Sequence, residues 1–255
     1  MAVFEPEQRE HWHDLHLLID DYFTHYNGYI FRGQADTSWP LESSLTRAIR
    51  RSCPDEANIE LTVRWHLAAF KENIRGRCSV DLHTATDETL WALGQHFGLY
   101  TPLLDWSASP YVALFFSLFG ECTSGRRCLW ALLESDVFDW AGQSGDIGKL
   151  KVVRPMSHDN PRLVNQRGLF LDVPVGRAVD AIVKDAPESE SVTLYKIDYP
   201  DAIRNDILAA LNNMNINYAS LFPDLVGSSL HANFQLEIES HLEEGRIRGF
   251  KGDEF

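Results

Sequence analysis

Apolar residues recur every three or four positions in several parts of the chain. In residues 8–25 this period predicts an amphipathic helix. The same period predicts helices over 59–74 and 200–211, and a last helix that begins after 221–225 and ends near Gly245. Short runs of β-branched, aromatic and aliphatic residues predict strands; these runs are 29–31, 103–104, 128–134, 150–153, 169–170 and 192–199. This mixture predicts an α+β fold with mixed or antiparallel sheets and flanking helices.

The stretch 91–119 contains one of the most apolar runs of the chain and clear helix-boundary residues. Its first helix is expected to stop at Gly98, because glycine adopts the left-handed conformation that ends many helices. After a short buried strand, Ser109 and Pro110 form an N-cap and first-turn pair for a second helix. Only one polar residue interrupts 111–119, so this second helix is predicted to be buried on all sides.

Polar and amphipathic side chains lie inside this apolar stretch; they are Gln95, His96, Asp105, Trp106 and Ser107. A buried polar group without a partner costs several kcal/mol, so each of these needs a reason. Asp105 and Ser107 fall between a strand and the N-terminus of a helix, where the dipole and free N–H groups favour anions. Structural roles stay open for all five, including a core histidine, a helix cap and an amide that bridges backbone groups.

The strand at 29–31 leads directly into Arg32, Gly33 and Gln34. An arginine at a strand end can present its planar fork to a phosphate or a carboxylate, and a glycine beside it lets a ligand approach the backbone. The alternative is an arginine that pairs with a core carboxylate such as Asp105. A second amide, that of Gln166, precedes the strand at 169–170 and is expected to reach the same site.

Length, composition and charge indicate which classes of protein this chain can belong to. The chain has 255 residues, of which 44% are hydrophobic, enough for one sizeable core. A net charge of −14 argues against a surface devoted to nucleic-acid phosphates. The candidates for a local basic strip are Arg47, Arg50, Arg51, Arg75 and Arg77.

No metal site or membrane segment is expected. The four cysteines lack CxxC spacing, and His11, His13 and His16 lack the i, i+4 spacing of a helical metal site. No signal peptide and no apolar run long enough to span a bilayer occurs in the sequence, which predicts a soluble, cytoplasmic protein.

Several of these segments together resemble the FRG domain, which is associated with bacterial and phage proteins, some in defence contexts. The resemblance includes FRGQ at 31–34, the long run at 95–116, NQRGLF at 165–170 and LFPDL at 221–225. It covers roughly 29–230. With an N-terminal helix in 1–28 and a C-terminal helix in 226–255, it predicts one domain over residues 1–255.

The order of the motifs is also similar to that of ADP-ribosyltransferases, which implies a split sheet and NAD as the substrate. Arg32 and Gly33 would match the strand-end pair that holds NAD, and Ser107, followed by Ala113 and Phe116, would match the serine motif beside the nicotinamide ribose. The catalytic glutamate of that fold has no counterpart in 161–174, where Gln166 stands in its place. Gln235-Leu236-Glu237 has the form of an alternative glutamate motif but lies in a helical repeat.

Three hypotheses follow. The first is an enzyme that splits NAD and passes ADP-ribose to a protein, a nucleic acid or water, as a defence or toxin effector would. Its catalytic residues would be Asp105, Gln166 and His96, and its cofactor-binding residues Arg32, Gly33, Gln34, Ser107, Trp106 and Gln95. The second is a non-catalytic domain that binds a nucleotide or a partner protein in the same cleft. The third is a hydrolase or nuclease in which Asp105 and His96 act as an acid–base pair.

Overall fold

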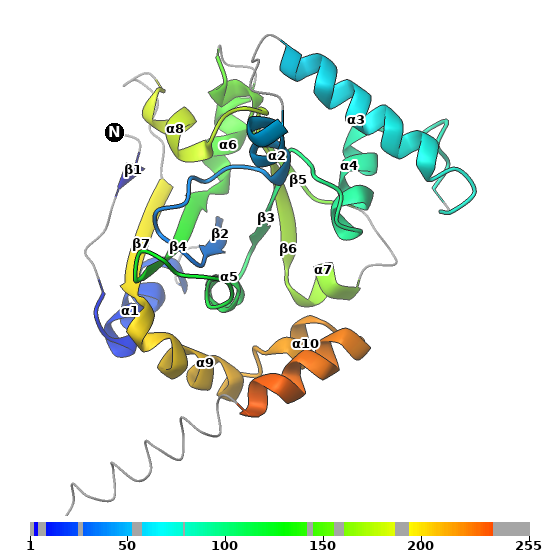
Figure 1. Ribbon diagram of the computed structural model, residues 1–255. Coiled ribbons are helices and arrows are strands. Elements are labelled where there is room, and N and C mark those ends of the chain that lie inside the picture. Colours follow the sequence, from blue (N-terminus) through cyan, green and yellow to red (C-terminus); the bar gives the residue numbers. More distant parts are fainter. Residues whose placement is uncertain are drawn as a thin grey trace, which may run out of the picture.

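The computed structural model describes residues 3–4, 9–24, 28–52, 58–78, 80–141, 145–155, 161–186 and 194–236 (Figure 1). Within them one seven-stranded sheet has the order β1-β7-β4-β2-β3-β6-β5. Its strands are β1 (Val3–Phe4), β2 (Tyr29–Gln34), β3 (Leu103–Ser107), β4 (Arg126–Leu133), β5 (Lys151–Val153), β6 (Gly168–Asp172) and β7 (Leu194–Pro200). All neighbouring strands are antiparallel except β1 and β7. The predicted α+β class is confirmed, whereas the single domain over 1–255 stays a prediction.

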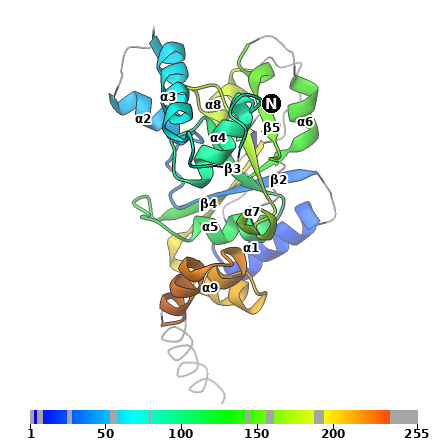
Figure 2. The ribbon, with the colours of Figure 1, turned by 90° about the vertical axis from the view of Figure 1, so that its right-hand side faces the viewer.

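Helices cover both faces of the sheet (Figures 1 and 2). They are α1 (Trp12–Ile19), the π-helix η1 (Asp20–Thr24), α2 (Ser44–Ser52), α3 (Ile59–Asn73), α4 (Asp87–His96), α5 (Pro110–Ser117), α6 (Glu134–Trp140), η3 (Ile147–Lys149), α7 (Pro161–Asn165), α8 (Val179–Lys184), η4 (Asp201–Ile203), α9 (Arg204–Asn213) and α10 (Tyr218–Leu221). Residues 225–236 are also helical. The helices α1, α5 and α9 share one hydrophobic cluster with β2, β4 and β7, and α2, α3 and α4 share another with β3, β5 and β6.

The boundaries predicted around the central stretch are confirmed. Helix α4 stops before Gly98, whose φ is +86°. Helix α5 begins at Pro110, and the Ser109 hydroxyl accepts a hydrogen bond from the backbone N–H of Val112. This helix is not buried on all sides, however, because Phe116 is 36% exposed. The end of the predicted last helix, beyond residue 236, lies outside the described residues.

The sheet is nearly divided between β2 and β3. Strand β2 pairs with β4 along its whole length, but its ladder with β3 consists of Phe31 opposite Ser107 alone. Beyond that point Arg32 and Asp105 lie on strands that have separated. A gap in the ladder leaves backbone and side-chain groups free to face a ligand.

Asp36 fixes the chain just after β2. Its carboxylate accepts hydrogen bonds from the backbone and hydroxyl of Ser38, from those of Thr123, and from the backbone of Ser124. Burial by itself would raise the pKa of Asp36, but these hydrogen bonds hold it well below the usual range. The carboxylate therefore ties the end of β2 to the turn before β4, a role that no local sequence pattern indicates.

Asp172→Asn is expected to stabilise the protein at pH 7. Burial and the nearby Glu88 raise the pKa of Asp172 to about 6, so its ionised form weakens the folded state. The stability that the protonated form provides is complete below the unfolded pKa near 3.9 and is lost as the pH rises through about 6. We expect a gain of about 1–3 kcal/mol in the free energy of unfolding at pH 7 and almost none at pH 4.

Urea unfolding of wild type and variant at both pH values checks this. Asp21→Asn, on the exposed surface of η1, is the control. An equal gain at pH 4 and pH 7 would contradict the assignment of the effect to ionisation of Asp172.

Candidate functional site

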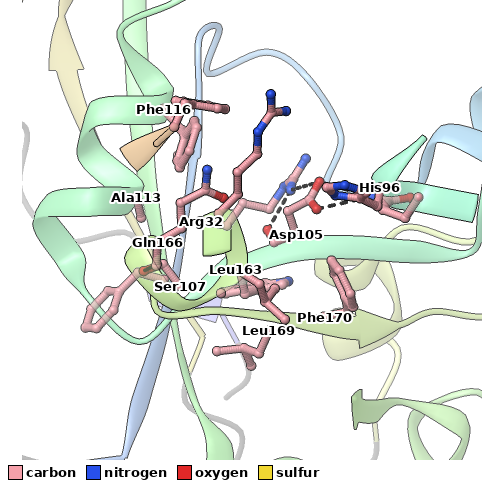
Figure 3. A pocket seen from close by; sticks show the side chains of 17 residues that line it. Arg32, His96, Asp105, Ser107, Ala113, Phe116, Leu163, Gln166, Leu169 and Phe170 are labelled. Carbon is pink, nitrogen blue, oxygen red and sulfur yellow. Dashed lines mark hydrogen bonds and ion pairs between the residues drawn. The ribbon is translucent and has the colours of Figure 1, made fainter. Parts of the chain in front are cut away.

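A hollow of about 410 Å³ opens at the gap between β2 and β3 (Figure 3). Its volume falls in the range of small-molecule sites. Besides Phe31 and Ala113, it is lined by Arg32, Gly33, Gln95, His96, Asp105, Trp106, Ser107, Phe116, Arg162, Leu163, Gln166, Gly168, Leu169, Phe170 and Phe222. Every predicted site residue except Gln34 is in this set.

Arg32 and Asp105 converge on the hollow without forming a dry, closed ion pair. Arg32 Nη1 donates to the backbone oxygen of Asp105 at 2.6 Å and lies 3.9 Å from its Oδ2. The Asp105 side chain is 65% exposed. Arg32 Nε is buried with no hydrogen-bond partner among the described residues, and burial lowers the pKa of this guanidinium while Asp105 opposes the change. An incoming anion would therefore satisfy a group that the protein leaves incompletely paired.

The Asp105 carboxylate is held by a chain of hydrogen bonds that starts in the core. The buried hydroxyl of Thr101 accepts from the backbone N–H of Leu103 and donates its only hydrogen to Gln95 Oε1. This fixes the orientation of the Gln95 amide. Gln95 Nε2 consequently faces Asp105 and donates to Oδ1 at 3.2 Å and to Oδ2 at 3.1 Å. Thr101 was not among the predicted site residues.

Ser107 and Gln166 join β3 to the segment after α7 and to α10. Ser107 Oγ donates to the backbone oxygen of Gln166 at 2.8 Å and accepts from the backbone N–H of Ser109 at 3.0 Å. Gln166 Nε2 donates to the backbone oxygen of Leu221 at 3.1 Å. The side chains of both residues thus hold the wall of the hollow together, which limits what either can offer to a ligand.

Segments far apart in the sequence therefore meet here: 31–34, 95–116, 165–170 and 221–225. Residues 27–124 match the family model of the FRG domain. These residues are the FRG-like part of the chain. No curated protein and no solved structure matches the chain. The third and fourth segments lie beyond the matched part of the FRG domain, yet they supply Gln166 and Phe222 to its hollow.

Two other predicted residues of the FRG motif have structural explanations. The buried amide of Gln34 accepts from Trp130 Nε1 at 2.6 Å and donates to the backbone oxygen of Pro40 at 3.2 Å, away from the hollow. A Cβ on Gly33 would lie 2.0 Å from the backbone oxygen of Ala113 in α5. The glycine is thus required by the close approach of α5 to β2, rather than only by a ligand.

Two further lining residues differ in burial: Trp106 is buried and His96 is exposed. Trp106 is 3% exposed and packs in the core cluster that includes Ile30, and its Nε1 has no hydrogen-bond partner among the described residues. His96 is exposed at the end of α4, with its ring 4.8 Å from that of Phe97. The hydrogen bonds that orient the Asp105 carboxylate come from Gln95, and the Asp105–His96 acid–base pair stays a prediction.

Arg162 enters the lining from α7 and was not among the predicted site residues. Arg162 donates through Nε to Asp224 Oδ2 at 2.8 Å, and its Cζ lies 5.2 Å from the centre of the Phe222 ring. Asp224 lies within the fourth resembling segment and Arg162 lies just before the third, and this proximity was the available signal. Their pairing could not be read from a sequence, because 62 positions separate them.

Gln235 is exposed on the helical stretch 225–236, and Glu237 lies outside the described residues. Within the described part of the chain, no group of three or more His, Cys, Asp or Glu side chains could hold a metal ion. Each helix in that part is too short or too polar to cross a bilayer.

Proposed function

We propose that the hollow of this FRG domain binds NAD and cleaves its nicotinamide–ribose bond, transferring ADP-ribose to a macromolecule or to water. The observation that supports this most is the convergence of Arg32 and Asp105, from two separated strands, on one hollow of about 410 Å³. With water as acceptor the reaction yields ADP-ribose, nicotinamide and a proton.

Arg32 would bind the diphosphate of NAD. Its guanidinium belongs to a half-buried side chain and carries a planar set of donors, of which only Nη1 has a hydrogen bond among the described residues. Diphosphate oxygens match that fork in charge and geometry. The bound diphosphate would then anchor the ribose on the neighbouring strand.

Asp105 would stabilise the positive charge that develops on the ribose. When the bond between the anomeric carbon and the nicotinamide nitrogen breaks, its electron pair leaves with neutral nicotinamide and the sugar gains oxocarbenium character. A carboxylate held in place by Gln95 lowers the energy of that state. The acceptor oxygen then bonds to the anomeric carbon and releases a proton, for which His96 on the same wall is the candidate acceptor. Gln166 could contribute only hydrogen bonds, because an amide carries no charge.

Incubating purified protein with NAD and measuring free nicotinamide by chromatography tests the proposal. Wild type is expected to release nicotinamide, and Arg32→Ala is expected to raise KM for NAD by about tenfold or more through loss of a charge-assisted contact. Arg51→Ala, exposed on α2, is the matched control. Absence of release from wild type at millimolar NAD, or equal KM values for wild type and Arg32→Ala, would contradict the proposal.

Thr101→Val is expected to reduce kcat for nicotinamide release by about tenfold, since valine keeps the shape of threonine but cannot orient the Gln95 amide. Thr101→Ser should restore most of the rate, because serine returns the hydroxyl. Steady-state kinetics of both variants, with thermal unfolding to confirm the fold, provide the measurement. A loss of rate that serine does not rescue would assign Thr101 a packing role only.

One observation favours a second candidate, a domain that binds a nucleotide without cleaving it. Among the lining residues Asp105 carries the only carboxylate, and Arg32 lies close enough to offset part of its charge. In that case ADP-ribose would increase the free energy of unfolding by RT ln(1 + [L]/Kd) and so raise the melting temperature. No nicotinamide would form from NAD.

A further inference from the structure

One wall of the hollow is aromatic. Helix α5 is otherwise largely buried, yet it exposes Phe116 at the lining. The Phe116 and Phe222 rings lie 6.0 Å apart at 79°, so they form a corner of two nearly perpendicular planes. Hydrophobic surface of this kind in a concave site favours a flat apolar ligand group over water.

Arg162 adds a third flat surface to this corner. Its guanidinium is held by Asp224 and lies over the Phe222 ring, while about a third of the side chain, 34%, stays exposed. Nucleobases stack on aromatic rings and on guanidinium planes alike. A guanidinium already fixed by an ion pair loses little further freedom when a base stacks on it. We call Phe116, Arg162 and Phe222 the aromatic wall.

The aromatic wall and Asp105 come from different parts of the fold. The wall belongs to α5, α7 and the residue after α10, whereas Asp105 and Gln95 belong to β3 and α4. In the view of Figure 3, Arg32 lies between Phe116 on one side and Asp105 with His96 on the other. In that view an acidic group, a guanidinium and the Phe116 ring follow one another across the hollow.

We propose that the aromatic wall binds the adenine ring of the substrate, so that the site selects a dinucleotide over nicotinamide mononucleotide. The order of groups along the hollow matches the order of groups in NAD: nicotinamide ribose, diphosphate, adenosine. This inference rests on the proposed function, since it assigns the diphosphate to Arg32 and the reacting ribose to Asp105.

Nicotinamide release from NAD and from nicotinamide mononucleotide, measured side by side, tests the inference. Wild type is expected to show a kcat/KM for NAD at least tenfold above that for the mononucleotide, from base stacking. Phe116→Leu should lower kcat/KM for NAD by about tenfold, mostly through KM, and leave the value for the mononucleotide unchanged. Phe138→Leu, an equally conservative change at a 61% exposed position on α6, should affect neither substrate.

Equal kcat/KM values of wild type for the two substrates, or equal losses for both in Phe116→Leu, would overturn the aromatic-wall assignment. If wild type cleaves neither substrate, the proposed cleavage fails, and thermal stabilisation by ADP-ribose and by ribose 5-phosphate decides the inference. Stronger stabilisation by ADP-ribose that disappears in Phe116→Leu would support the aromatic wall. Equal stabilisation by the two ligands, or none, would overturn it.

Discussion

Asp105→Asn is expected to lower kcat for nicotinamide release from NAD by about 100-fold or more. Asparagine keeps the shape of aspartate, and its amide oxygen can still accept a hydrogen bond from Gln95 Nε2. What the substitution removes is the negative charge beside the ribose, which matters most when oxocarbenium character develops. The ribose of ADP-ribose carries no positive charge, so the affinity for ADP-ribose should change little.

The measurement for this variant combines nicotinamide release with a thermal titration by ADP-ribose. Asp21→Asn on η1 controls for the loss of one negative charge from the protein surface. A variant that retains the wild-type rate would remove Asp105 from the catalytic role. A variant that loses both rate and ADP-ribose binding would show that Asp105 acts in binding instead.

Gly33→Ala is expected to destabilise the fold by about 3–5 kcal/mol or to prevent folding. The new Cβ would lie 2.0 Å from the backbone oxygen of Ala113 and 2.7 Å from the backbone nitrogen of Ser117. Both belong to α5, so the helix would have to move away from β2 and open the core. Soluble yield and the melting temperature provide the measurement.

Gly76→Ala is the matched control for Gly33→Ala. At Gly76 the added Cβ would meet nothing within 4 Å, but φ is +69°, so the expected cost is that of a left-handed residue alone, about 1–2 kcal/mol. A Gly33→Ala protein as stable as Gly76→Ala would show that α5 and β2 do not approach as closely as the structure has them.

Local patterns predicted the fold class and the helix boundaries because the residues that determine them are neighbours in the chain. Ser109 caps α5 and Gly98 follows α4 as their types predict. The burial of α5 was predicted wrongly at Phe116, since apolar composition cannot distinguish a core face from the wall of a hollow. Arg32 and Asp105 were expected just after the strands at 29–31 and 103–104, but they lie within β2 and β3, which run further than those apolar residues; both line the hollow.

Predictions about partners across the fold were less successful. Gln34 was assigned to the ligand, but its hydrogen bond with Trp130 depends on β4 lying beside β2, and no local pattern reveals that strand order. The Arg162–Asp224 pair joins residues 62 positions apart, of which only Asp224 lies in a segment of the FRG resemblance. Thr101 was not among the predicted site residues, because its bond to Gln95 forms only when the strand folds back on α4.

A crystal structure of the protein with ADP-ribose tests the central claim most directly. We expect the diphosphate within hydrogen-bond distance of the Arg32 guanidinium, the terminal ribose beside the Asp105 carboxylate and the adenine stacked on the aromatic wall. ADP-ribose bound elsewhere on the protein, or a hollow that stays closed to it at millimolar concentration, would contradict the claim that Arg32 and Asp105 form a nucleotide site.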